Sequence, residues 1–299
     1  MKEFLESSQY RPGSTAFTLF KKTFGSNLLV SILLGIVSFI LFSIVCLVTL
    51  SSKFAEIISF SKKYTEAASQ STSQNELAEM ISNFVMGFNP IVIIIINVVV
   101  ILLYSMILTS VLKVNDNYVR RLETEPLKAI GSVFSKKYLH LALGSIAVWA
   151  VMTLVNQGFT VLLEQVIGKT GVVYYFVLFI FSIILIILYF RFSLIFPAIV
   201  HGNMNFIDGI VYSWKNITFK RGGMLLLLCL AMFIGLFLAM VVLILIASGI
   251  SGVSSGFAFI FTILSIFLVY YGVFNYSASA MTTLYFRYSK EEAEIDESM

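Results

Sequence analysis

Positive charge lies on only one side of six long apolar stretches, and this asymmetry constrains the fold more than any other feature. The stretches cover residues 28–50, 91–111, 139–163, 172–190, 224–246 and 257–281. Each is long enough to cross a bilayer, which takes about 20 mostly apolar residues. Sixteen of the 20 Lys and Arg residues lie in the N-terminal segment, the second and fourth connections and the C-terminal tail. Because cytoplasmic segments carry the excess of Lys and Arg, the sequence predicts six transmembrane helices with both termini in the cytoplasm.

The composition fits one membrane domain. The chain is 59% hydrophobic and 12% charged, whereas soluble proteins are about 25% charged. The Lys and Arg residues that hold connections in the cytoplasm account for nearly all of the net charge of +4. We therefore expect no nucleic-acid partner. Cys46 and Cys229 lie within apolar stretches, without a second Cys or a His at ligand spacing, so we expect no metal site. We therefore predict a single transmembrane domain over 1–299, with an outer helical loop at 51–89 and an acidic cytoplasmic tail at 287–299.

Three amphipathic stretches precede the first, third and fifth apolar stretches. They centre on Phe20, Phe134 and Trp214, have helical periodicity, and each is followed by Lys within two residues. Pro12 and Pro126 stand where the first two helices would begin. This predicts three helices lying in the cytoplasmic interface, each leading into a two-helix hairpin, with an approximate threefold parallel repeat. The repeat units are about 12–111, 126–190 and 205–286. The alternative is that these are ordinary amphipathic loop edges.

The polar residues within the apolar stretches are mostly amides. No ionisable residue lies in the central turns, which removes the usual groups of ion-coupled transport. Amides in hydrocarbon usually form hydrogen bonds between two helices. The alternative, functional interpretation is that they line a transport pathway. The intramembrane polar candidates are Asn97, Asn156, Gln157 and Asn275.

Basic residues at the cytoplasmic ends of the spans are candidates for binding anionic lipid headgroups. The apolar run continues past Arg191, and Pro197 then interrupts regular helical hydrogen bonding. His201 and Asp208 follow on the same cytoplasmic side. The headgroup candidates are Arg120, Arg121, Lys136, Lys137 and Arg191. The alternative is that these charges only fix orientation.

The sequence holds no catalytic constellation that we can assemble. Its two histidines, His140 and His201, stand outside any HExxH frame, and there is no GxSxG, Walker or CxxC motif. We therefore expect no enzyme activity, no cofactor and no catalytic residue.

Two segments resemble a group of bacterial six-helix membrane proteins. They are "RFSLIFPAIVHGNMNFIDGIVYSWKNITFKRGG" and "SASAMTTLYFRYSKEE". The group includes the membrane domain that accompanies some glycerophosphodiester phosphodiesterases, and the YciC-like inner-membrane proteins. The resemblance implies a six-helix architecture in the bacterial inner membrane, and it carries no catalytic residue over to this chain.

The expected function is therefore that of a non-enzymatic membrane protein. It would be a scaffold or accessory factor that works through lipids, a membrane-protein partner or a second copy of itself. The alternative is a carrier or flippase for a lipid-like or amphipathic solute. Integral enzymes acting on lipid are the least favoured class, since the spans lack reactive groups.

Overall fold

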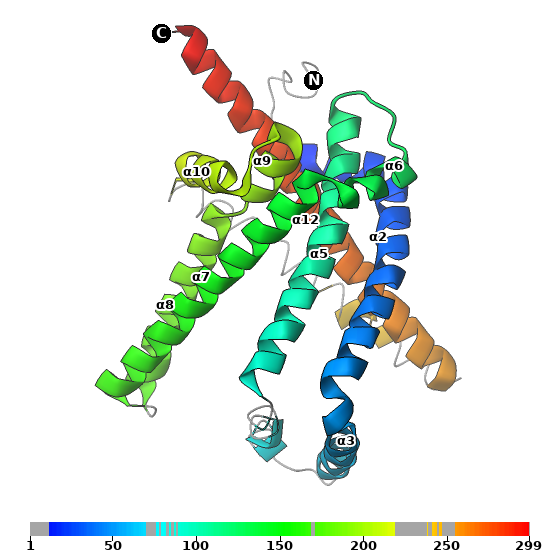
Figure 1. Ribbon diagram of the computed structural model, residues 1–299, viewed down its shortest axis with the longest axis vertical. Coiled ribbons are helices and arrows are strands. Elements are labelled where there is room, and N and C mark those ends of the chain that lie inside the picture. The colour runs from blue at the N-terminus through cyan, green and yellow to red at the C-terminus, as the bar shows by residue number, and fades with distance from the viewer. Residues whose placement is uncertain are drawn as a thin grey trace. The chain divides into compact units, whose positions relative to one another are not determined.

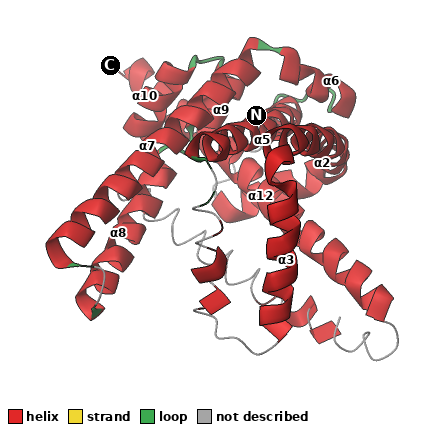
Figure 2. Ribbon diagram, turned by 60° about the horizontal axis from the view of Figure 1, so that its bottom comes forward, coloured by secondary structure: helices red, strands yellow, loops and turns green. Residues whose placement is uncertain are grey.

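The computed structural model of this chain consists of helices joined by short turns (Figures 1 and 2). It describes residues 12–69, 76–77, 79–81, 84, 87, 89–168, 171–218, 238, 241–243, 245–246 and 255–298. Among these residues there is no β-strand, so the predicted all-α class is confirmed.

Four of the described helical segments are long and apolar enough to cross a membrane. They are Thr15–Leu50, Pro90–Val119, Lys136–Ile167 and Val172–Gly202. The predicted fifth stretch, 224–246, lies almost wholly outside the described residues. The predicted sixth, 257–281, falls within the helix α12, Ser255–Ser298. Membrane-spanning potential is therefore confirmed for four segments, while six spans remain a prediction.

The chain divides into two compact units. Unit 1 comprises residues 1–32 and 105–299, and unit 2 comprises residues 33–104. The helices α2 (Pro12–Leu50) and α5 (Pro90–Val119) each contribute residues to both units. Unit 1 also holds α6 (Pro126–Gly131), η2 (Ser132–Phe134), α7 (Lys136–Ile167), α8 (Val172–Arg191), α9 (Ile195–Gly202), α10 (Phe206–Asn216) and α12.

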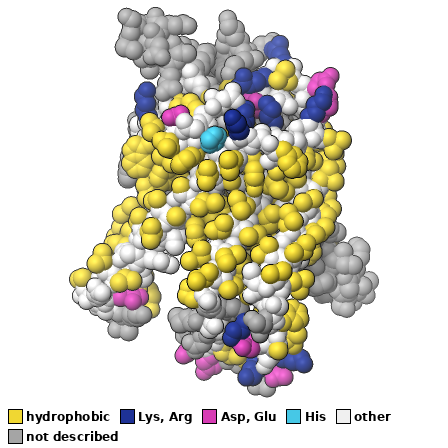
Figure 3. Space-filling model, viewed as in Figure 1, with side chains coloured by type: hydrophobic (Ala, Val, Ile, Leu, Met, Phe, Trp, Pro, Cys, Tyr) yellow, Lys and Arg dark blue, Asp and Glu magenta, His cyan; other side chains and the backbone are white. Residues whose placement is uncertain are grey.

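In unit 1, α7 and α8 form a hairpin, and the short helices α9 and α10 pack against α7 (Figure 1). Hydrophobic side chains cover the flanks of α7 and α8 in Figure 3. A turn at residues 192–194 separates α8 from α9. Asn203, in the left-handed region with φ 55°, ends α9, a conformation that Asn tolerates better than most residues. Asn205 then caps α10 by accepting a hydrogen bond from the Asp208 backbone N–H.

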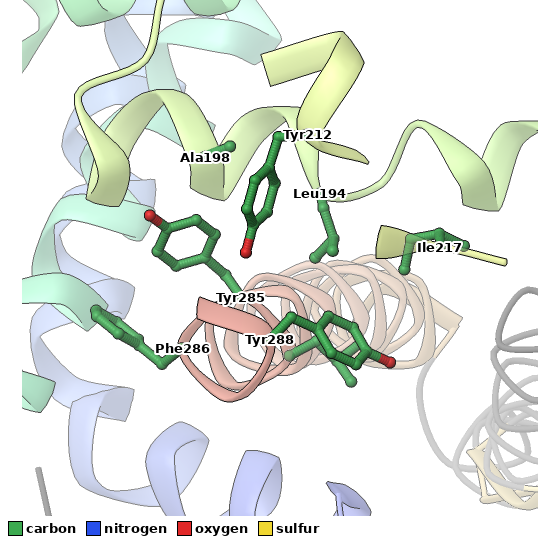
Figure 4. Packing of buried hydrophobic residues seen from close by; sticks show 8 residues of the cluster. Leu194, Ala198, Tyr212, Ile217, Tyr285, Phe286 and Tyr288 are labelled. Carbon is green, nitrogen blue, oxygen red and sulfur yellow. The ribbon is translucent and has the colours of Figure 1, made fainter. Parts of the chain in front are cut away.

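An aromatic cluster holds α9 and α10 against α12 (Figure 4). Tyr212 points from α10 toward Tyr285 on α12, and their ring centroids are 5.5 Å apart. The Tyr212 hydroxyl lies 3.1 Å from the Ser289 hydroxyl. The cluster is completed by Leu194, Ala198, Ile217, Leu284, Phe286 and Tyr288. These contacts with α12 matter for α9, because a helix of eight residues has little stability by itself.

Buried polar side chains also join the long helices of unit 1. Asn27 on α2 donates to the Asn115 side chain on α5 at 3.2 Å. Ser105 on α5 donates to Ser145 on α7 at 3.2 Å. The Tyr271 hydroxyl of α12 donates to the Phe24 carbonyl of α2 at 2.9 Å. Such bonds are the usual means of association between helices that share an apolar environment.

Unit 2 contains the η1 turn Ser51–Lys53 and the helix α3, Phe54–Ser69. Lys53 pairs with Glu56 at 2.8 Å, and both side chains are exposed. Phe60 stacks on Phe84 with ring centroids 4.0 Å apart. The first half of the predicted outer loop is therefore helical, and much of its second half lies outside the described residues.

The first predicted interfacial helix is wrong as a separate element. The stretch around Phe20 belongs to α2, which continues without a break to Leu50. The physical reason is the lack of any helix-breaking proline after Pro12 in this helix.

The stretch around Phe134 forms the short α6 and η2, which Pro126 begins after Glu125. Lys128 donates to the Glu125 carboxylate at 2.7 Å, and this bond lowers the pKa of the Glu125 carboxyl. Phe134 is 92% exposed. The stretch around Trp214 forms α10 as a separate helix. The threefold repeat, which needs three equivalent units, remains a prediction.

Candidate functional site

A buried carboxylate is the centre of a charged cluster at the end of α5. The Asp116 side chain is 3% exposed. It accepts a hydrogen bond from Lys113 Nζ at 3.0 Å and another from Arg120 Nε at 2.7 Å. Lys113 precedes Asp116 by three positions on α5, and Arg120 follows it by four, just past the end of the helix, the spacing at which side chains meet. The two cations compensate a charge that is costly to bury alone.

The same cluster binds the C-terminal end of α9. Arg120 Nη2 donates to the His201 carbonyl at 2.8 Å. Lys137, at the start of α7, donates to the Val200 carbonyl at 2.8 Å. The last carbonyls of a helix lack intrahelical partners and carry partial negative charge, so cations stabilise this end. Arg120 therefore links α5 to α9, and Lys137 links α7 to α9.

His201 extends the cluster to α12. Its buried ring lies with Nδ1 3.4 Å from Asp116 Oδ1 and Nε2 3.1 Å from the Thr282 hydroxyl oxygen. The Thr282 hydroxyl also donates to the Ala278 carbonyl. The imidazole therefore stands between the Asp116 carboxylate of α5 and the Thr282 hydroxyl of α12.

Arg191 binds the C-terminal end of the other short helix, α10. Its guanidinium donates to the Ile217 carbonyl at 3.0 Å and to the Trp214 carbonyl at 3.2 Å. It also stacks on the Trp214 ring, 3.9 Å from the ring centroid. A planar guanidinium suits this double role of capping and stacking.

The five headgroup candidates thus fall into two groups. Arg120, Lys137 and Arg191 donate to backbone carbonyls at the ends of α9 and α10. Arg121 and Lys136 have exposed side chains. In Figure 3, the Lys and Arg side chains of unit 1 gather at one end of the apolar surface. Three cations of the cluster (Lys113, Arg120 and Lys137) face one carboxylate, which leaves this end positively charged.

The four intramembrane amides are not alike. Asn97, in unit 2, donates to the Ile93 carbonyl of its own helix. Asn275 is fully buried in α12 and donates to the Tyr271 carbonyl, while its own side-chain oxygen has no partner among the described residues. Asn156 and Gln157 are exposed on α7.

Asn156 and Gln157 line an open groove between α7 and α8 with a volume of about 430 Å³. Its other lining residues are Trp149, Met152, Thr153, Ser182, Leu185 and Ile186.

Sequence reasoning missed Asp116. Its local signal was the spacing of Lys113, Asp116 and Arg120, which places the three side chains on one helix face. The contact with His201 joins residues far apart in the sequence, and nothing in the local pattern reveals it.

Among the described residues, no group of three or more His, Cys, Asp or Glu side chains is arranged to hold a metal ion. Comparison of the chain with protein-family models, with curated proteins and with solved structures finds no match.

Proposed function

We propose that this protein is a non-enzymatic integral membrane protein that acts as a scaffold or accessory factor through its contacts with lipids. The observation that supports this most directly is the orientation of α10. Its inward face carries Gly209, Tyr212, Ser213 and Asn216, which are buried. Its outward face exposes Ile207, Val211 and Trp214.

This arrangement is the reverse of a helix on a soluble protein, whose apolar face is turned inward. An outward apolar stripe at i, i+4 and i+7 is matched by the acyl boundary of a membrane, where interfacial helices lie. Trp is favoured at this depth, since its ring is apolar and its N–H is polar. The exposed Leu127 and Phe134 of α6 and η2 offer a second apolar contact of the same kind.

The charge of the neighbouring cluster supports anionic lipid as the preferred contact. Lys113, Arg120 and Lys137 outnumber the single carboxylate of Asp116, and exposed Lys136 adds a further cation. Juxtamembrane basic residues each contribute about 1 kcal/mol toward anionic lipid. Lipid headgroups would then lie against the end of unit 1 that carries α9 and α10.

Fluorescence quenching tests the position of α10, because the chain has only two tryptophans, Trp149 and Trp214. In a Trp149→Phe variant, Trp214 is the only tryptophan and reports on α10. We expect its strongest quenching by phospholipids brominated close to the headgroup. The matched variant, Trp214→Phe, leaves Trp149 on α7, within the span, and we expect lipids brominated close to the headgroup to quench it weakly. Absence of lipid quenching of Trp214 would contradict the proposal.

Lipid retention tests the preference for anionic headgroups. The double variant Arg121→Gln and Lys136→Gln should retain less anionic lipid after purification, by about fivefold per charge at 1 kcal/mol each. Lys62→Gln and Lys63→Gln, on α3 in unit 2, remove the same charge and provide the control. Native mass spectrometry should show a loss of bound anionic lipid in the Arg121 and Lys136 variant only. Equal losses in the two double variants would refute the preference.

The alternative, a carrier or flippase for a lipid-like solute, has less support. Such a protein needs polar groups that face one path across the bilayer. Asn156 and Gln157 are exposed on α7, whereas Asn275 is buried within α12. These amides do not share one lining in the described part of the chain.

A further inference from the structure

In the part of the chain that the structure describes, the amides of the α7–α8 groove have no hydrogen-bond partner. In the described structure, the side chains of Asn156 and Gln157 make no hydrogen bond, and neither does the Thr153 hydroxyl one turn away. Thr160, the next polar residue on this face, is satisfied by the Asn156 carbonyl. The outer half of α7 therefore carries a short polar stripe with unused donors and acceptors.

These groups lie below the membrane surface. Glu164 is the only Asp, Glu, Lys or Arg residue between Lys137 and Lys169, so it marks the outer end of the span. At 1.5 Å per residue, Gln157 and Asn156 lie about 10 and 12 Å inside Glu164 along the helix. Hydrocarbon offers no hydrogen bonds, and an unsatisfied polar group there costs free energy. The stripe therefore requires a polar partner within the bilayer.

Among the described residues, the other intramembrane amides do not supply that partner. Asn97 bonds to its own helix, and Asn275 is buried. The predicted fifth stretch, 224–246, contains no Ser, Thr, Asn, Gln or charged residue in its sequence. A lipid acyl chain fills an apolar groove and leaves both amides unpaired. The partner must be a second polar surface at the same depth.

We propose that a second copy of this chain binds at the α7–α8 groove, with Asn156 and Gln157 of each copy pairing with those of the other. A carboxamide both donates and accepts, so it is its own complement. A twofold axis along the membrane normal places each residue opposite the same residue of the other copy, at equal depth.

This interface does not depend on lipid binding at α10, which lies at the other end of α7, near Lys137. The two proposals can therefore fail separately. The groove proposal also differs from a solute pathway, because it requires contact between two copies and the pathway does not.

Disulfide cross-linking of the full chain in its membrane tests the geometry. Cys46 and Cys229 are first replaced by Ala, and Thr153→Cys is added on the groove face. Leu154→Cys is the matched control, because Leu154 lies at the same depth on another face of α7 and is 70% exposed. We expect cross-linked dimer from Thr153→Cys and little from Leu154→Cys. Equal cross-linking of the two variants overturns the proposal.

Dimerisation measured by energy transfer in liposomes tests the role of the amides. Asn156→Leu with Gln157→Met keeps side-chain size and removes the hydrogen bonds. We expect the dimer to dissociate about tenfold more readily, a change of about 1.4 kcal/mol. Thr160→Val, whose hydroxyl bonds within α7, should leave the dissociation constant within about twofold. A chain that is monomeric at every protein-to-lipid ratio, or a double variant that dimerises as tightly as the wild type, refutes the pairing and leaves the groove to a lipid, a solute or a different protein.

Discussion

Replacing Asp116 by Asn should destabilise unit 1 by removing the charge that holds its cations. The carboxylate accepts hydrogen bonds from Lys113 at 3.0 Å and Arg120 at 2.7 Å. Hydrogen bonds to charged groups contribute about 1.5–3 kcal/mol each. Asn keeps one acceptor and turns an amide N–H₂ toward the cations, so about half of this contribution is lost. Because the side chains of Lys113 and Arg120 are 29% and 45% exposed, water offsets a further part.

We therefore expect Asp116→Asn to lower the free energy of unfolding by about 2 kcal/mol, below the roughly 3–5 kcal/mol for breaking a fully buried pair. Equilibrium unfolding in mixed micelles measures this difference. Glu56→Gln is the control, since it removes the acidic partner of an exposed Lys at the same spacing. An exposed pair contributes about 0–1 kcal/mol. If Asp116→Asn and Glu56→Gln have equal effects, the carboxylate of Asp116 does not organise the cluster.

Two further substitutions test the capping of α10. Asn205→Ala removes the side chain that accepts from the Asp208 N–H, and the unfolding free energy should fall by about 1 kcal/mol; Asn205→Asp should restore most of it, and a neutral Ala variant would contradict the cap. Arg191→Lys keeps the charge and loses the planar contact with Trp214, so the melting temperature should fall although topology is unchanged. Equal melting temperatures for the Lys variant and the wild type would show that charge alone suffices.

Hydropathy and charge predicted the helices well because both depend on local sequence. The spans at α2, α5, α7 and α8 follow directly from apolar length. The stretches around Phe134 and Trp214 were predicted from their periodicity, and they are helical in α6–η2 and α10. The first stretch was wrong as a separate helix because amphipathicity does not determine where a helix ends. Without a helix breaker, the chain through Phe20 continues into α2.

The partners of the basic residues could not be predicted in this way. A cluster of Lys and Arg beside a span indicates orientation whether it faces lipid, water or protein. Arg120 and Lys137 bond to carbonyls of α9, and Arg191 bonds to carbonyls near the end of α10. Those carbonyls lack intrahelical partners because α9 ends at Gly202 and α10 ends at Asn216. Their positions depend on tertiary packing, which no single segment encodes.

The cations near α9 and α10 can have two roles at once: they orient the protein in the membrane, and they stabilise the ends of these short helices. Helices of eight and eleven residues are too short to be stable in isolation, so they need contacts at their ends. Cations suit the C-terminal ends, where carbonyls are unpaired. By the positive-inside rule, we expect those cations on the cytoplasmic side of the membrane. A layer of short helices is therefore easier to build on that side than on the other. The same asymmetric distribution of Lys and Arg supports the proposed lipid contact of α10.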